Sequence, residues 1–259
     1  MLLAKDIIEI IENAAPQDLQ YSWDNSGFLC GNKNKEVEKL YITLDTNVYT
    51  VNEAAAAGAD MILSHHPILF RGANNIDYDT PQGYILKELV KNDIALYAAH
   101  TSMDCANGGI NDILADKLGI INKKIIEKNN SYEGCGLGRY GELEKSVTLR
   151  EFGEMVKQAL KTPFVRVCGD LDAEIKKAAV GGGACDDLIP EAKRLGAEVM
   201  VTADMKYHNA MDSVESGIYI IDAGHYPTEN FVTEIFENLF KNADIEIIRS
   251  TEKDVFKFI

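Results

Sequence analysis

Short apolar runs alternate with amphipathic stretches through most of this chain. The apolar runs at residues 40–44, 60–63 and 94–99 have the length and composition of buried β-strands. The stretches at 48–57 and 82–91, which lie between these runs, have the periodicity of helices. Strands that are separated by single helices predict βαβ units and a largely parallel sheet.

Two further segments read as helices. Residues 1–12 place charged side chains inside every short apolar run, which is typical of an amphipathic helix and not of a signal peptide. Another helix is predicted at residues 110–118, directly after the Gly108-Gly109 turn. No apolar stretch approaches the roughly 20 residues that a membrane span requires. We therefore expect no membrane association.

One segment of the first half returns in the second half. Residues 52–64 align without a gap with residues 190–202, and in both copies a helix ends at Gly-Ala and a buried strand follows. This unit is common in α/β proteins, so the match alone is weak evidence. The spacing His100-x-x-x-Asp104 also returns in the same order, as His225-x-x-x-Glu229. We therefore predict an α/β fold of two similar βαβ-type lobes from an internal duplication, with a metal site in the cleft between them.

The repeat also predicts where the lobes begin and end. Residues 1–125 form the first lobe and residues 126–229 form the second. Residues 230–259 are expected to pack back onto the first lobe.

Composition and charge exclude several functional classes. The chain has 259 residues and a net charge of −15, and so acidic a protein repels the phosphate backbone of nucleic acids. Its five cysteines are odd in number and show no C-x-x-C spacing, which favours a reducing compartment. We expect a cytoplasmic protein that binds neither nucleic acid nor membrane.

Four of the five histidines lie in three short patterns. Each pattern follows an apolar run that reads as a buried strand, at residues 61–63, 94–99 and 218–221. The patterns are Ser64-His65-His66-Pro67, His100-Thr-Ser-Met-Asp104 and His225-Tyr-Pro-Thr-Glu229. Imidazole and carboxylate together are the ligand set of zinc, iron and manganese, and α/β proteins build sites at strand ends. The leading hypothesis is therefore a bound pair of metal ions.

Each candidate ligand also has a purely structural interpretation. An isolated His-His pair is more often one core histidine and one exposed histidine. Here His65 and His66 follow a buried strand and Pro67 extends the backbone, so the two rings can reach two different ions. A turn would account for Asp104 and a helix cap for Glu229. Neither explains why a histidine precedes both acids by four residues, about one helical turn. We therefore favour metal ligands.

Three other features stay open or receive a structural interpretation. His208 is either a substrate contact or proton carrier, or a solvent-exposed side chain. Arg139, which follows Gly134-Cys-Gly-Leu-Gly138, is a candidate contact for a substrate phosphate. Gly181-Gly-Gly183 lies between a predicted strand and a helix that begins near Asp186, and it is interpreted as a tight turn and not as a phosphate loop.

Taken together, these segments resemble the GTP cyclohydrolase I type 2 family, also called the NIF-three-like family. The matching pieces follow the family's order along most of the chain: Trp23-Asp-Asn-Ser-Gly27, Leu44-Asp45, Ser64-His-His-Pro67, His100-Thr-x-x-Asp104, Gly108-Gly-x-Asn111, Gly136-x-Gly-Arg139, Gly181-Gly-Gly183 and Gly224-His225-x-x-x-Glu229. Each piece alone is weak, but the ordered set is specific. The stretch from residue 125 to 179 leaves no room for the domain that some members carry as an insertion. The chain therefore resembles the short form.

The resemblance implies a two-lobed α/β fold, a site for two divalent metal ions and a ring-shaped homohexamer. Carried onto this chain, the family's metal ligands are His65, His66, Asp104, His225 and Glu229. Glu229 is then the bridge between the ions. His100 lies next to the ions as a further ligand or as an acid/base, and it is the one catalytic candidate.

Two classes of function remain open. One is a metal-dependent hydrolase that acts on a nucleotide or a related small molecule, with two metal ions activating water. The other is a protein that binds or delivers metal, or forms a ring around it, without catalysis. The ligand set suits zinc, iron and manganese alike.

Overall fold

The computed structural model describes residues 1–257 and 259, and these form two compact units. Unit 1 comprises Met1–Met103 and Val232–Lys253, and unit 2 comprises Asp104–Phe231 and Asp254–Ile259. The boundary between lobes predicted at residue 125 lies within strand β7 (Ile120–Lys128). In the structure, residues 104–125 belong to unit 2. In the part of the chain that is described, no helix combines the length and the apolar character that crossing a membrane requires.

Unit 1 is built on a five-stranded sheet with the strand order β13-β4-β5-β6-β2. The first four strands are parallel to one another, and only the edge strand β2 is antiparallel. A separate two-stranded pair joins β1 and β3. The strands are β1 (Leu2–Leu3), β2 (Gly27–Cys30), β3 (Glu36–Val37), β4 (Lys39–Thr43), β5 (Met61–Ser64), β6 (Ala95–Ala98) and β13 (Glu246–Arg249).

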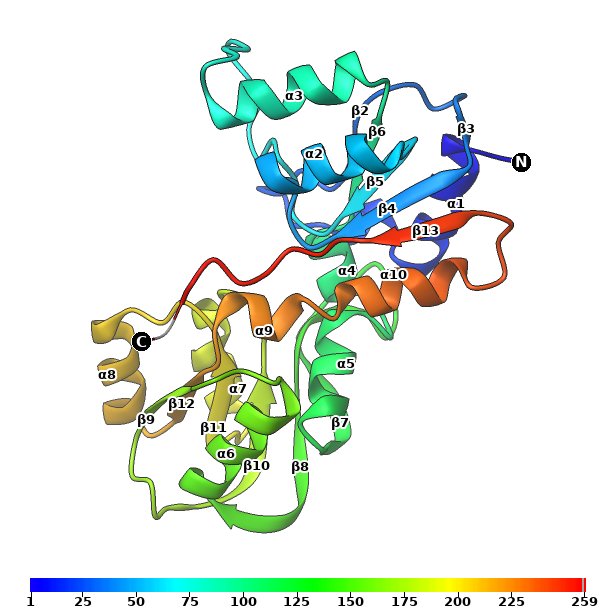
Figure 1. Cartoon of the computed structure of the whole chain (residues 1–259). Coiled ribbons are helices and arrows are strands. Elements are labelled where there is room, and N and C mark those ends of the chain that lie inside the picture. The colour runs from blue at the N-terminus through cyan, green and yellow to red at the C-terminus, as the bar shows by residue number, and fades with distance from the viewer. Residues whose placement is uncertain (258) are drawn as a thin grey trace. The chain divides into compact units, whose positions relative to one another are not determined.

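Helices cover both faces of this sheet, with α2 and α3 together on one side and α10 on the other (Figure 1). α2 and α3 pack on the face that carries Tyr41, Ile62 and Leu96. On the opposite face α1 contacts α10, and the Tyr97 hydroxyl donates to Glu12 of α1 at 3.1 Å. The helices are α1 (Ala4–Ala14), η1 (Gln17–Leu19), α2 (Val48–Ala57), α3 (Pro81–Lys91), α4 (Thr101–Cys105, across the unit boundary) and α10 (Val232–Phe240).

Unit 2 contains a six-stranded mixed sheet with the order β7-β8-β10-β11-β12-β9. Only β10, β11 and β12 are parallel, because β7 and β8 form a long antiparallel hairpin and β9 is an antiparallel edge. The prediction of a largely parallel sheet is therefore correct for unit 1. In unit 2 it holds only for the three strands at the centre of the sheet. The remaining strands are β8 (Gly136–Thr148), β9 (Arg166–Cys168), β10 (Glu174–Val180), β11 (Val199–Thr202) and β12 (Tyr219–Asp222).

The core of unit 2 lies between this sheet and its helices. Ala179, Met200 and Ile220 of the parallel strands pack against Leu188 and Ala192, which belong to η2 and α7. α5 and α6 contact β8 and β10, and α8 contacts β9 and β12. The helices are α5 (Ile110–Lys117), α6 (Leu149–Ala159), η2 (Asp186–Leu188), α7 (Ile189–Arg194), α8 (Tyr207–Ser216) and α9 (His225–Glu229).

The repeated segment has the same structure in both units. In unit 1 it is α2 followed by β5, and in unit 2 it is α7 followed by β11. A glycine in the left-handed region stops each helix, Gly58 at φ +69° and Gly196 at φ +89°, where a Cβ would be strained. Each strand is central and parallel in its sheet. The predicted α/β fold of two similar units is confirmed.

Candidate metal centre

The first group of candidate ligands lies at the carboxyl ends of parallel strands in unit 1. β4, β5 and β6 are neighbours and end in register with one another. Asp45, His66 and His100 are each the second residue after one of these strand ends, and His65 directly follows β5. Because the strands are parallel, residues at equivalent positions meet at one edge of the sheet.

The three imidazoles of this group lie close together. The centroids of the His65 and His66 rings are 4.8 Å apart, and those of His65 and His100 are 5.1 Å apart. One ring nitrogen of each residue lies within 4.8 Å of the others. His65 is fully buried, whereas the side chains of His66 and His100 are 16% and 13% exposed. The group is thus a largely buried set of nitrogen donors that solvent still reaches.

Each imidazole of the group uses Nδ1 to contact an oxygen that only accepts hydrogen bonds. The pairs are His65 with the Ala99 carbonyl (2.7 Å), His66 with Asp45 Oδ1 (2.8 Å) and His100 with Asp24 Oδ1 (2.7 Å). A carbonyl or carboxylate oxygen cannot donate, so the ring proton is on Nδ1 and the lone pair is on Nε2. Histidines that bind metals have this same second hydrogen bond.

Asp24 is the most strongly held of these acceptors. Its side chain is fully buried and also accepts from the Thr101 backbone amide (3.1 Å), the Thr101 hydroxyl (2.5 Å) and the Ser26 hydroxyl (2.8 Å). Burial alone would raise the pKa of Asp24. The hydrogen bond from His100, with those from Thr101 and Ser26, instead holds this pKa well below its ordinary range. The carboxylate stays ionised and fixes the orientation of His100.

The second group of candidate ligands lies in unit 2. His225 begins α9 and Glu229 ends it, so one helical turn brings His225 Nε2 to 2.9 Å from Glu229 Oε2. Asp104 lies in α4, and one of its carboxylate oxygens is within 4.8 Å of one from Glu229. The structure therefore brings all three predicted ligands of this unit together.

The two carboxylates of this group are close and almost completely buried. Asp104 is 6% exposed and Glu229 is 3% exposed. Burial, followed by the nearby charges of Asp104 and Glu229, raises the pKa of the Cys185 thiol well above its ordinary value. Two like charges this close in a poorly solvated place repel each other, and a bound cation relieves that repulsion.

Asp204 orients His225 as the other acceptors orient their histidines. His225 Nδ1 donates to Asp204 Oδ2 at 2.6 Å. Asp204 is the second residue after β11 and aligns with His66 in the repeat. At this position unit 2 therefore has an orienting acid, whereas unit 1 has a candidate ligand. Its backbone is left-handed at φ +56°, a conformation that aspartate tolerates better than most residues.

Each group has donors of the kinds that divalent cations bind. Four imidazole Nε2 atoms and two carboxylates match the ligand preferences of zinc, iron and manganese. The sequence pattern predicted candidate ligands but gave no role to the three orienting acids, Asp24, Asp45 and Asp204. Asp24 lies in the motif Trp23-Asp-Asn-Ser-Gly27 and Asp45 in Leu44-Asp45, but the histidine that each acid contacts is far away in the chain.

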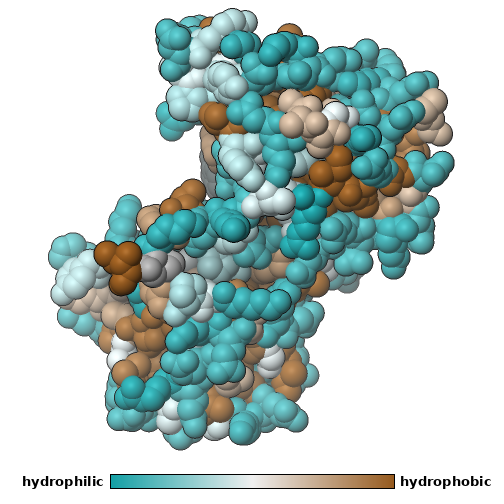
Figure 2. Space-filling model, in the orientation of Figure 1, coloured by the Kyte–Doolittle hydropathy of each residue, from teal (hydrophilic) through white to brown (hydrophobic). Residues whose placement is uncertain are grey.

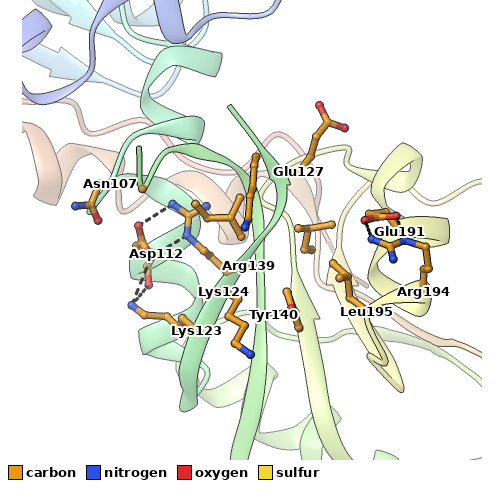
Figure 3. Close-up of a pocket in the computed structure, with 14 residues that line it drawn as sticks. Asn107, Asp112, Lys123, Lys124, Glu127, Arg139, Tyr140, Glu191, Arg194 and Leu195 are labelled. Carbon is orange, nitrogen blue, oxygen red and sulfur yellow. Dashed lines mark hydrogen bonds and ion pairs between the residues drawn. The ribbon is translucent and has the colours of Figure 1, made fainter. Parts of the chain in front are cut away.

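The expected phosphate contact at Arg139 is wrong. Arg139 is one of the residues that line an open pocket in unit 2 (Figure 3). The pocket has a volume of about 890 Å³, yet the side chain of Arg139 is only 2% exposed. Nε and Nη2 donate to Asp112, each at 2.8 Å. Nη1 donates to the carbonyls of Gly136 and Gly138, and Nη2 also donates to the carbonyl of Ala106. All five donors are used within the protein, so Arg139 has a structural role.

The glycine stretch after β10 is a tight turn, as predicted. Its three amides donate to Val201 O (3.0 Å), Asn111 Oδ1 (3.0 Å) and Thr228 Oγ1 (3.1 Å). These amides are therefore not directed at a phosphate. His208 is exposed on α8 and belongs to none of the ligand groups formed by the described residues.

Comparison with known proteins agrees with this architecture. A family model described as Duf34/NIF3 (NGG1p interacting factor 3) matches residues 2–255. A Clostridium perfringens protein named GTP cyclohydrolase 1 type 2 homolog is 39% identical over 258 residues, with 98% of each chain covered. The crystal structure of a Bacillus cereus protein related to NIF3 has a TM-score of 0.90 at 28% identity, covering 100% of this chain and 99% of that one. Reduced HcgD from Methanocaldococcus jannaschii has a TM-score of 0.84 at 33% identity, with 97% and 98% covered.

Proposed function

The chain belongs to the Duf34/NIF3 family, and from this premise we propose that it is a metal-dependent hydrolase acting on a nucleotide or a related small molecule. One observation carries the proposal. All four histidines of the two groups hold Nδ1 against an oxygen acceptor and so present Nε2 as the donor atom. Histidines that only fill a core have no reason to share one tautomer, whereas metal ligands do.

We propose that the two groups together bind a pair of divalent cations. Unit 1 contributes His65 and His66, and unit 2 contributes Asp104, His225 and Glu229. The order of the family motifs along the chain supports this assignment. The chain also passes from one group to the other within about one helical turn, since His100 directly precedes α4 and Asp104 lies within it. The family resemblance assigns the bridging role to Glu229.

His100 is the residue proposed to move protons. Divalent cations in such a site supply Lewis acidity and lower the pKa of water, which is the chemistry that hydrolytic enzymes use. Nε2 of His100 accepts a proton from one reacting group and returns it to another. Asp24 keeps the ring in one orientation and stabilises the positive charge that His100 carries in between, as the carboxylate of a catalytic triad does.

The test combines metal content with turnover. Protein loaded with Mn²⁺ gives the number of bound ions, and its electron paramagnetic resonance spectrum reports whether two ions are magnetically coupled. We expect a coupled pair in the wild type and loss of the coupling in both His66→Ala and Glu229→Ala. His208→Ala is the matched control, because this histidine is exposed and lies outside the ligand groups of the described chain.

The outcomes separate the two functional classes. Turnover of GTP or a related nucleotide by the wild type, and its loss in His100→Ala with both ions retained, supports hydrolysis. A coupled pair that turns over no nucleotide points instead to metal delivery. Uncoupled ions, or a pair that survives both ligand substitutions, would refute the shared site.

Assembly and location form part of the same proposal. We propose a homohexamer, which the family resemblance implies, and sedimentation velocity of the metal-loaded protein tests it. A protein that stays monomeric at working concentrations would contradict it. We also propose a cytoplasmic location, because all five cysteines are free thiols.

A further inference from the structure

We propose that Trp23 and Phe70 form a stacking surface that recognises the planar ring of a nitrogen heterocycle beside His100. This inference rests on the proposed function, because it names the substrate class of the same site. The chemistry that fits is a flat aromatic base that also carries an anionic group.

The exposure of these two rings is the starting observation. Trp23 is 59% exposed and Phe70 is 48% exposed. Exposed apolar side chains are common, and the face shown in Figure 2 carries several small hydrophobic patches on a hydrophilic surface. Exposure alone therefore means little. What distinguishes these two residues is the neighbour that they share.

Both rings contact the imidazole proposed to move protons. The centroids of the Trp23 and His100 rings are 5.9 Å apart, and their planes make an angle of 72°. The centroids of the Phe70 and His100 rings are 5.5 Å apart, and their planes make an angle of 82°. Both are edge-on arrangements, so each aromatic ring stands nearly perpendicular to the imidazole. A flat ring stacked on either one would therefore lie beside His100, within reach of proton transfer.

Two contacts order the segments that carry these rings. Tyr21 stacks on Trp23, with centroids 5.9 Å apart and planes inclined by 25°. The Asn25 side chain donates to the Leu69 carbonyl at 2.5 Å, which ties the segment of Trp23 to the segment of Phe70. A Trp23 ring that is already oriented loses less conformational entropy when a ligand stacks on it.

The charge nearby favours a ligand with an anionic group. Arg71 follows Phe70 and is exposed. It is a planar cation suited to phosphate or carboxylate, in a protein whose net charge is −15. A purine nucleotide combines both features and is the probe of choice. Triphosphate, which has the charge but no ring, is the matched comparison.

Trp23 is the only tryptophan of the chain, so its fluorescence reports on this surface alone. Zinc-loaded protein is titrated with GTP and, separately, with inorganic triphosphate. We expect GTP to quench or shift the Trp23 emission and triphosphate to leave it unchanged. Calorimetry on the same protein gives the dissociation constant for GTP. We expect Phe70→Leu and Trp23→Leu each to raise that constant about tenfold, or ~1.4 kcal/mol, as for a lost stacking partner.

Tyr207→Leu is the matched control, because Tyr207 is 77% exposed in unit 2 and lies outside the proposed surface. Zinc content is measured for every variant. The inference is overturned if GTP binds without changing the emission, if GTP does not bind, or if the Trp23 and Phe70 variants bind it as tightly as the Tyr207 variant does. Loss of zinc, or absence of turnover with stacking intact, would instead refute the proposed function.

Discussion

Removing the carboxylate of Asp45 should weaken metal binding without disturbing the fold. Asp45 Oδ1 accepts from His66 Nδ1 at 2.8 Å and holds that ring with Nε2 as the donor atom. The Asp45 backbone is fixed independently, since its carbonyl accepts from the hydroxyls of Thr43 (3.1 Å) and Thr50 (2.9 Å). Asp45→Ala therefore removes the hydrogen bond to His66 and leaves these backbone contacts in place.

The size of the effect follows from the exposure of the pair. Losing the acid that orients a metal-binding histidine typically costs about 10- to 100-fold in metal affinity. The Asp45 side chain is 45% exposed, so water can partly replace it at Nδ1, and we expect about tenfold for Asp45→Ala, near 1.4 kcal/mol. Asp45→Asn keeps an acceptor oxygen and loses only the charge. Its affinity should fall by about threefold, since charge contributes roughly half of such a bond.

The assay is competition for Zn²⁺ and for Mn²⁺ against a chromogenic chelator, with urea unfolding curves to confirm equal stability. Asp79→Ala is the control, because Asp79 is exposed and belongs to none of the ligand groups that the described residues form. We expect the dissociation constant to be largest for Asp45→Ala and smaller for Asp45→Asn. It should be smallest, and equal, for the wild type and the control. Equal affinity of Asp45→Ala and the control would show that Asp45 does not orient a metal ligand.

Three further predictions concern the second unit. In Gly183→Ala, where φ is +63°, the new Cβ would overlap the Glu229 carboxylate, so metal content should fall. Gly196→Ala is the control, because φ is +89° there and the nearest atom that a Cβ would meet is 3.9 Å away. This control should show only the loss of stability caused by the strained backbone. Asp112→Asn leaves the buried guanidinium of Arg139 without its carboxylate, and the free energy of urea unfolding should fall by about 3–5 kcal/mol. Burial opposes ionisation of Asp112, but the hydrogen bonds and charge of Arg139 lower its pKa from 3.8. The wild type should therefore keep its full advantage over Asp112→Asn above about pH 5 and lose it as pH falls through the folded-state pKa.

Each of these predictions has an outcome that contradicts it. Equal metal content in the Gly183 and Gly196 variants would remove the steric argument. A loss below about 1 kcal/mol in Asp112→Asn would mean that the pair behaves as an exposed one. A stability difference that stays constant from neutral pH to about pH 2 would show that this carboxyl is not the titrating group.

Local sequence patterns were sufficient for the central strands and for the helices between them. β4, β5 and β6 are buried on both faces and therefore read as continuous apolar runs, and α2 has the same bounds as its prediction. The strands within residues 120–148 do not have such a clear local pattern. Their hairpin of β7 and β8 contains a register shift between Ile121 and Lys124, and such an irregularity interrupts the period-two pattern by which a strand is recognised.

By itself, the sequence was enough to predict which side chains are candidates to carry the chemistry. Histidines and acids placed just after buried strands can be recognised because strand length and side-chain type are local properties. Only the tertiary structure decided how each donor is held. The partnership of His100 with Asp24 spans 76 residues, and that of His66 with Asp45 spans 21. Such pairs depend on which strands become neighbours and on the register in which they end. Register is set by packing across the whole sheet, and no short segment contains it.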